Sequence, residues 1–331
     1  MNRWSVSPFV MLCCLLLFPQ RCPAPLIYTP GEGWHYESVG EGSWRRGRAK
    51  DQLELAQAAF DLKEYGVAMK AARRTVSVWP FTDYAPKAQY LLARCYEAKG
   101  QDERAFNAYQ KLIERYPKLD NFDEILRRQF EIANRFLAGK SFKLWGYIPF
   151  FPSMDKTIRM YEHIVKTGRY SEVAPQAQMN IAVAHEKKEV LGFIKNPDYP
   201  AAARAYEIAA DRYSDQKAGV DALYKVGEAC TKQAATAEYD QSVAGLAIAN
   251  FTDFMTLHPD DTRVAAAQKA IDTLKTEQAR GSFEIAKYYE KRHRWKAAQI
   301  YYNDAWNKDA SSQYADEARR RIEAINKRLA P

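Results

Sequence analysis

The 331-residue sequence is poor in the residues that build metal sites and disulfide frameworks. It contains five cysteines and five histidines, and three of the cysteines lie within the first 22 residues. The other two, Cys95 and Cys230, are so far apart that we expect buried free thiols rather than a disulfide. His185-Glu186 opens a stretch like a zinc-protease helix, but Glu189 stands where the second histidine must be.

Motifs that carry chemistry are also missing. The 15 glycines are scattered, and none heads a strand–helix unit of the kind that cradles a phosphate. No Gly-x-Ser-x-Gly elbow occurs either. We therefore predict that the protein is not an enzyme, and that it has no cofactor, no metal ion and no catalytic residue.

The charge balance favours an acidic partner or surface without pointing to nucleic acid. The net charge is +8, yet 49 Lys and Arg residues are spread among 41 Asp and Glu residues. Because no concentrated basic stripe accompanies a recognition motif, we predict no nucleic-acid binding. Runs of β-branched residues are scarce, and alanine, leucine, lysine, glutamate and tyrosine are plentiful, which favours an all-α fold.

The stretch Pro86–Pro117 gives that fold its pattern. Ala93 and Tyr96 share one face of a first helix, and Gly100 ends it. Small and aromatic residues then recur at the helical period, and their order is Ala105, Tyr109, Leu112. A helix–turn–helix unit of about 34 residues with this pattern resembles a tetratricopeptide repeat.

Similar patterns of small and aromatic residues recur through the rest of the chain. They end, for example, with Ala247, Phe251 and Phe254, or with Ala298, Tyr302 and Ala305. We count five or six helix pairs, depending on whether the long helix before Gly281 is divided. The predicted fold is all-α, with tandem tetratricopeptide-like helix–turn–helix repeats over residues 49–331 forming a superhelical solenoid.

The N-terminus predicts export. An apolar run of ten residues, 9–18, follows Arg3, long enough for a signal-peptide core and about half of what a membrane-spanning helix needs. We assign residues 1–24 to the signal peptide. Two endings remain open: lipidation of Cys22, or a conventional cleavage after Ala24. Residues 25–48, rich in proline, glycine and aromatics, are interpreted as an extended arm.

An insertion at 139–154 is too apolar for an ordinary solvated loop. Its aromatic residues include Trp145, Tyr147, Phe150 and Phe151. Either the insertion folds back and fills a gap between repeats, or it projects as a finger onto a partner or a lipid interface.

Residues 283–298, FEIAKYYEKRHRWKAA, carry a more specific resemblance. They are similar to the last repeats of the BamD family of outer-membrane protein assembly lipoproteins, of which the chain looks like a divergent member. The resemblance implies a scaffold on the periplasmic side of the outer membrane, possessing a lipid anchor if Cys22 is modified. Its implied partners are the barrel-assembly core protein and unfolded outer-membrane proteins.

Carried over by position, the resemblance places Arg292, Trp295 and Tyr301 on the face that binds the core protein. Tyr301, with Ile300, stands where the family commonly has Asn-Arg, which departs from a charge-based contact. Tyr65 and Tyr90 are the implied lining of a groove for substrate strands. The alternative function is another exported tetratricopeptide-repeat adaptor of the cell envelope, related to peptidoglycan or division.

Overall fold

The computed structural model describes residues 26–29, 33–36, 44–144, 148–149, 152–190, 194–236 and 241–329. The predicted signal peptide, the candidate lipidation site Cys22 and the insertion's Trp145, Tyr147, Phe150 and Phe151 lie outside these residues. Those assignments stay predictions.

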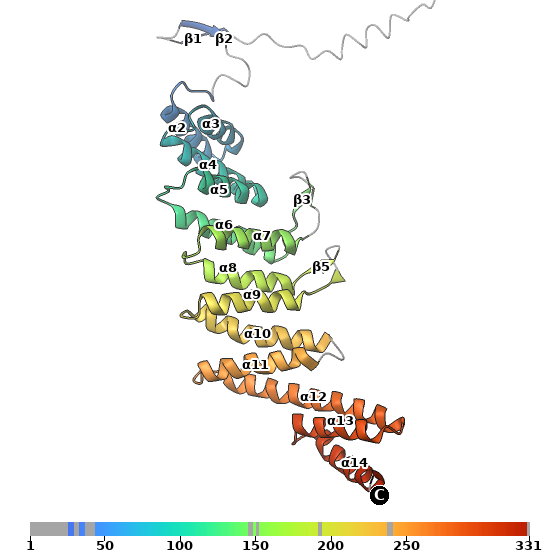
Figure 1. Ribbon diagram of the computed structural model, residues 1–331. Helices are drawn as coiled ribbons and strands as arrows, with labels where there is room; N and C mark the ends of the chain where they lie inside the picture. The colour runs from blue at the N-terminus through green and yellow to red at the C-terminus, as the bar shows by residue number, and fades with distance from the viewer. Residues whose placement is uncertain are drawn as a thin grey trace, which may run out of the picture. The chain divides into compact units, whose positions relative to one another are not determined.

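Thirteen helices make up most of the described chain, and within each of its two compact units consecutive helices pack on one another (Figure 1). They form six pairs and a last single helix: α2 (Ala49–Asp61) with α3 (Tyr65–Val78), α4 (Tyr84–Ala98) with α5 (Asp102–Arg115), α6 (Phe122–Leu137) with α7 (Met154–Thr167), α8 (Ala174–Glu186) with α9 (Tyr199–Arg212), α10 (Lys217–Thr236) with α11 (Gln241–Leu257), α12 (Val264–Lys291) with α13 (Trp295–Lys308), and α14 (Gln313–Leu329). The fold is all-α and consists of tandem tetratricopeptide-like helix pairs, as predicted.

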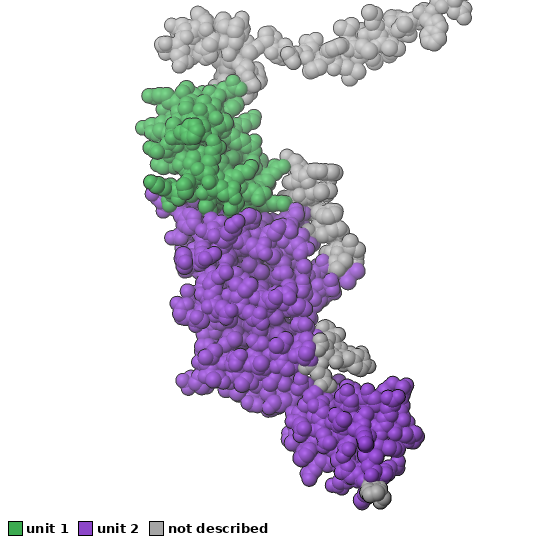
Figure 2. All heavy atoms as spheres, in the orientation of Figure 1, with its two compact units in different colours: residues 1–119 green, residues 120–331 purple. Residues whose placement is uncertain are grey.

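The chain divides into two compact units, residues 1–119 and 120–331, which Figure 2 shows in green and purple. The repeat pattern predicts one domain over residues 49–331, and no sequence signal at residue 119 distinguishes that position from the other joints between pairs. Within unit 1, α3 packs on α2 and α4, and α5 packs on α4. Within unit 2, each helix from α6 to α14 packs on the next.

Small residues let the paired helices approach closely. Ala93 on α4 and Ala105 on α5 have no exposed surface, and Tyr109 and Leu112 are equally buried. The same holds in unit 2 for Ala298, Tyr302 and Ala305 on α13. These residues form the core that the repeated phrase predicts, because each helix buries one apolar stripe against its neighbour.

The tight turns within pairs share one left-handed residue. Gly100, the predicted break, has a φ of +65°, and its N–H donates to the Glu97 carbonyl at 2.8 Å. Lys63 and His293 take the same position in their pairs with φ values of +62° and +58°. Their N–H groups donate to Phe60 and Glu290 at 2.9 Å in each case. The same turn therefore forms with and without glycine, although a side chain is strained there.

Buried tyrosines tie the two helices of a pair together. The Tyr109 hydroxyl on α5 donates to Glu97 at the end of α4 over 3.0 Å. In unit 2, Tyr302 on α13 donates to Glu290 on α12 in the same way, and Tyr161 on α7 donates to Asn134 on α6 over 2.6 Å. Burial, reinforced by Glu290, raises the pKa of Tyr302 well above its usual value.

A second tyrosine tie joins consecutive pairs. The Tyr116 hydroxyl, just after α5, donates to the carbonyl of Pro80, just after α3, at 3.2 Å. Tyr213, just after α9, donates to the carbonyl of Arg169, just after α7, at 3.4 Å. Both hydroxyls satisfy a backbone acceptor that follows a helix end.

The last pair contains the longest helix of the described chain. α12 runs without a break through Gly281, so the long helix is one member of a sixth pair rather than two helices. α14 packs on both α12 and α13 and buries Ile325 to 1% exposure. Arg321 of α14 also pairs with Glu290 at 3.4 Å, which ties α14 to the tyrosine–glutamate contact of the preceding pair.

The described residues outside the helices include three two-stranded hairpins. β1 (Leu26–Thr29) pairs with β2 (Gly33–Tyr36) inside the segment interpreted as an extended arm. β3 (Lys143–Leu144) pairs with β4 (Ile148–Pro149) in the 139–154 insertion. β5 (Glu189–Val190) pairs with β6 (Ile194–Lys195) between α8 and α9. None of these strand pairs follows from the helical pattern of the sequence.

The described start of the 139–154 insertion is fixed to the helices. Phe142 is 3% exposed and stacks on Phe136 of α6, with the ring centroids 4.1 Å apart. The Nζ of Lys156 on α7 also lies over the Phe142 ring, 4.7 Å from its centre. The first aromatic residue of the insertion therefore packs into unit 2.

Candidate protein-binding surfaces

Arg292, an implied partner-binding residue, lies exposed at the turn between α12 and α13. Its guanidinium covers the ring of Tyr288 at 4.4 Å from the ring centre, and Tyr288 is itself 51% exposed. The two residues are four apart, which places them on one face of the end of α12. An arginine in a cation–π contact with an exposed tyrosine can still donate hydrogen bonds through its N–H groups.

Tyr301 belongs to the same surface. Its ring stacks on Tyr289 with centroids 5.4 Å apart and an interplanar angle of 10°, and Tyr289 contacts Tyr288 edge-on at 5.5 Å. The neighbouring Ile300 is 66% exposed. We name the set formed by Tyr288, Tyr289, Arg292, Ile300 and Tyr301 the α12–α13 surface.

Trp295 lies elsewhere on the same pair. It is half-buried at the first turn of α13, where Arg328 of α14 lies 4.8 Å from its ring centre and His293 contacts it edge-on at 5.3 Å. Six residues separate it from Tyr301, which turns the two side chains about 120° apart around the helix axis. The structure thus brings Arg292 and Tyr301 together through two tyrosines and leaves Trp295 against α14.

Tyr65 and Tyr90, the implied substrate groove, are linked within unit 1. Tyr65 at the start of α3 packs edge-on against Phe60 of α2, with centroids 5.5 Å apart. Arg94 of α4 lies over Phe60 at 5.7 Å and over Tyr90 at 5.9 Å. Tyr90 also leans on Tyr109 of α5. Both tyrosines are half-buried, so they form a continuous aromatic and cationic strip rather than two isolated side chains.

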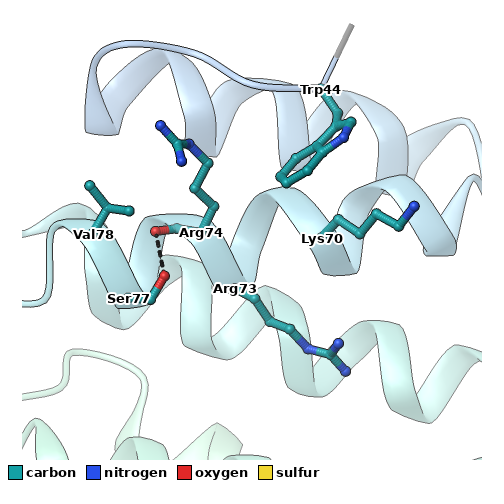
Figure 3. Close-up of a pocket in the computed structure, with 6 residues that line it drawn as sticks. All are labelled: Trp44, Lys70, Arg73, Arg74, Ser77 and Val78. Atoms are coloured by element: carbon teal, nitrogen blue, oxygen red, sulfur yellow. Dashed lines mark hydrogen bonds between the residues drawn. The ribbon is translucent and has the colours of Figure 1, made fainter. Parts of the chain in front are cut away.

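A pocket on α3 was not foreseen from the sequence. It has a volume of about 330 Å³ and is lined by Trp44, Lys70, Arg73, Arg74, Ser77 and Val78, which we call the α3 pocket (Figure 3). Neither Tyr65 nor Tyr90 contributes to it. The signal in the sequence was Lys70, Arg73 and Arg74 at helical spacing, which places three cations along one side of α3. No pattern in the sequence indicates that Trp44 lines the same pocket.

The cations that line the α3 pocket differ from one another in the residues they contact. Arg74 lies 5.5 Å from the ring centre of Trp79, and its Nε is buried without a hydrogen-bond partner among the described residues. Arg73 points away from the opening and contacts both the hydroxyl and the ring of Tyr96 on α4. Within the described chain, neither Lys70 nor Arg74 pairs with a carboxylate.

The two cysteines of the helical body are free and buried, as predicted. Burial raises the pKa of the Cys95 thiol to about 11, and it also raises that of Cys230. The described residues contain no group of three or more His, Cys, Asp or Glu side chains placed to hold a metal ion. Among the same residues, no helix is both long enough and apolar enough to cross a bilayer.

Comparison with known proteins supports the repeat class. Residues 87–118, which cover nearly all of the stretch Pro86–Pro117, match the tetratricopeptide-repeat family model. No curated protein matches the sequence. Protein binding through extended repeat surfaces is the kind of activity that such stacked helix pairs perform.

Solved structures align at low similarity. The C-terminal part of a TPR repeat-containing protein from Cytophaga hutchinsonii aligns with 15% identity over 83% of this chain and 88% of that one, at a TM-score of 0.34. MamA from Desulfovibrio magneticus aligns with 12% identity over 66% of this chain and 98% of that one, at a TM-score of 0.32. A tetratricopeptide repeat protein from Parabacteroides merdae aligns with 10% identity over 84% of this chain and 98% of that one, at a TM-score of 0.32. TM-scores this low carry no argument, so the fold rests on the helix pairs themselves.

Proposed function

We propose that the chain is a non-catalytic scaffold of the outer-membrane β-barrel protein assembly machinery, exported to the periplasmic side of that membrane. The proposal begins from the resemblance of residues 283–298 to the last repeats of the BamD family. In it, the α12–α13 surface binds the barrel-assembly core protein, and the strip of Tyr65, Arg94 and Tyr90 receives a strand of an unfolded outer-membrane protein.

The observation that carries the proposal is the composition of the α12–α13 surface. Protein interfaces are enriched in tyrosine and arginine, and these residues dominate binding energies. Here Arg292 covers an exposed tyrosine, two further tyrosines stack beside it, and Ile300 is 66% exposed. Because the tyrosines already pack on one another, little side-chain freedom is lost when a partner binds.

The test is co-purification of the full-length chain with a barrel-assembly core protein in mild detergent, comparing wild type with Arg292→Glu. Loss of a central arginine contact costs about 2 kcal/mol, so we expect roughly a thirtyfold weaker association. Arg127→Glu on α6 is the matched control, since Arg127 is exposed in the same unit and makes only a 3.6 Å ion pair with Glu172. It is expected to bind as the wild type does.

Circular dichroism checks that both variants stay helical, because an exposed turn residue contributes little to stability. Absence of wild-type co-purification, together with normal outer-membrane barrel levels after depletion of the protein, would contradict this function. That result would favour the alternative, an exported adaptor of peptidoglycan or division. Equal weakening by Arg292→Glu and Arg127→Glu would instead show that the core protein responds to charge in general and not to the α12–α13 surface.

A further inference from the structure

We propose that unit 1 carries a binding site for the phosphate groups of an anionic phospholipid surface, formed by the α3 pocket and the basic segment 45–50 beside it. The proposal needs a membrane within reach and so rests on the export proposed above. It does not depend on β-barrel assembly or on the α12–α13 surface.

The α3 pocket provides the hydrogen-bond donors. Figure 3 shows the guanidinium of Arg74 and the indole of Trp44 on either side of the space above α3, with Lys70 beside Trp44. Arg74 is already oriented by Trp79, 5.5 Å from its ring centre, so its donors are in place before a ligand arrives. Guanidinium and ammonium groups are the side chains that bind phosphate oxygens most strongly. Ser77 also lines the pocket, and its hydroxyl donates to the Arg74 carbonyl at 3.2 Å.

The surroundings of the pocket are basic as well. Residues 44–78 contain eight Lys and Arg residues and four Asp and Glu residues. Asp51 pairs with Arg48 at 2.8 Å and Glu54 pairs with Lys50 at 3.8 Å, so two of the acids each neutralise one of these cations, and the net charge of the stretch is +4. A basic cluster of this size is attracted to anionic lipid within about a Debye length of the surface.

Apolar residues next to the cations favour a lipid surface over an acidic peptide. Val78 lines the α3 pocket and is 48% exposed, and Phe81, three residues further on, is 99% exposed. A peptide site would enclose its aromatic residues in a groove, whereas Phe81 has almost no cover from the protein. Trp44, with Arg45 5.2 Å from its ring centre, has the apolar body and polar edge that suit the head-group region.

The position of the α3 pocket near the start of the helical body agrees with a lipid surface as its ligand. Trp44 follows the candidate lipidation site Cys22 by 22 residues, a stretch that reaches at most about 75 Å when fully extended. Unit 1 therefore contains the part of the helical body nearest in sequence to the lipid anchor that modification of Cys22 would provide.

The experiment is co-flotation of the full, processed chain with vesicles of phosphatidylcholine alone or with 30% phosphatidylglycerol, a composition of about physiological charge density. We compare the wild type with Lys70→Gln/Arg74→Gln and with a control that removes the same charge, Lys87→Gln/Lys99→Gln, of which Lys87 lies on α4 and Lys99 directly follows it. We expect the pocket variant to lose about tenfold in affinity for the anionic vesicles only, and the control to lose less than twofold.

Phe81→Ala provides a second variant that cannot disturb the fold, since the ring is 99% exposed, and a loss of threefold or more is expected. Free inorganic phosphate and a poly-glutamate peptide serve as competitors at constant ionic strength. Equal losses for pocket and control variants, or no dependence on phosphatidylglycerol, would overturn the proposal. Displacement by millimolar free phosphate would reassign the pocket to a small phosphate ligand, and selective displacement by poly-glutamate would reassign it to an acidic protein.

These outcomes are separate from those of the proposed function. Vesicle binding is measured without the barrel-assembly core protein, and Arg292→Glu is expected to float as the wild type does. Loss of co-purification with intact flotation, or the reverse, therefore identifies which of the two proposals has failed.

Discussion

Replacing one glycine by alanine is expected to have opposite effects in two neighbouring helices of unit 2. Gly227 lies within α10, and Gly245 lies within α11. A methyl group at Gly227 would meet three ring atoms of Phe251 at 2.7–2.8 Å, whereas a methyl group at Gly245 would have nothing within 4 Å. In a helix interior, glycine is less favourable than alanine by about 0.5–1 kcal/mol.

For Gly245→Ala, only the helix propensity changes, so we expect stabilisation by about 0.5–1 kcal/mol. For Gly227→Ala, the Phe251 ring must move by about 0.7 Å to restore ordinary contact. The ring is only 2% exposed and contacts Tyr224 edge-on at 5.6 Å, so it has little room. Overpacking of this kind costs about 1–3 kcal/mol, which outweighs the gain in propensity and leaves a net loss of about 1 kcal/mol.

The assay is urea unfolding followed by circular dichroism, with the midpoint compared among wild type, Gly227→Ala and Gly245→Ala at a common slope. The two variants should lie on opposite sides of the wild type, separated by roughly 2 kcal/mol. If Gly227→Ala stabilises the protein as much as Gly245→Ala does, α10 and α11 do not approach each other as closely as described, and the reasoning fails.

Three further predictions use the same measurement. Asn134→Ala removes the oxygen that accepts a hydrogen bond from the buried Tyr161 hydroxyl, so it should lower the free energy of unfolding by about 1–3 kcal/mol. The exposed change His163→Gln is the control and should leave the free energy of unfolding almost unchanged. Equal effects of the two changes would rule out the buried contact. Lys63→Gly relieves a φ of +62° and should stabilise the protein by about 0.5–1 kcal/mol, and a loss would show that the turn is not strained. Burial lowers the pKa of His185 from its usual value of 6.5, so below that pH the unfolded chain takes up a proton that the folded chain resists. The urea midpoint should therefore fall between pH 7.5 and 5.5, and less steeply in His185→Gln; identical pH profiles would refute the assignment.

The helix pairs are readable from the sequence because their packing is encoded locally. Ala93, Ala105 and Tyr109 are buried because the 3.6-residue period alone decides which side of each helix faces its neighbour. The turns are only partly readable. The glycine at position 100 indicates a left-handed residue in the sequence. Lys63 and His293 adopt the same conformation, but no glycine indicates it there.

The candidate surfaces depend on contacts that no local pattern specifies. The resemblance that groups Arg292, Trp295 and Tyr301 does not reveal that Trp295 lies under Arg328 of α14. The cations of the α3 pocket were visible as a spacing, but a pocket also requires Trp44 to fold back over α3, which is a tertiary event. Spacing therefore predicts which residues share a helix face, and not which second element covers that face.

The two tyrosine ties and the positions of the insertions together show where this architecture tolerates change. In unit 2, both hairpins occur between the two helices of a pair, at the place of the left-handed turn, and the joint between α7 and α8 keeps its tie from Tyr213 to Arg169. Additional chain can enter there without altering the step from one pair to the next. For an engineer, the turn within a pair is the natural insertion point for a reporter or a new binding loop, whereas a residue added between pairs would break the hydroxyl contact that joins them.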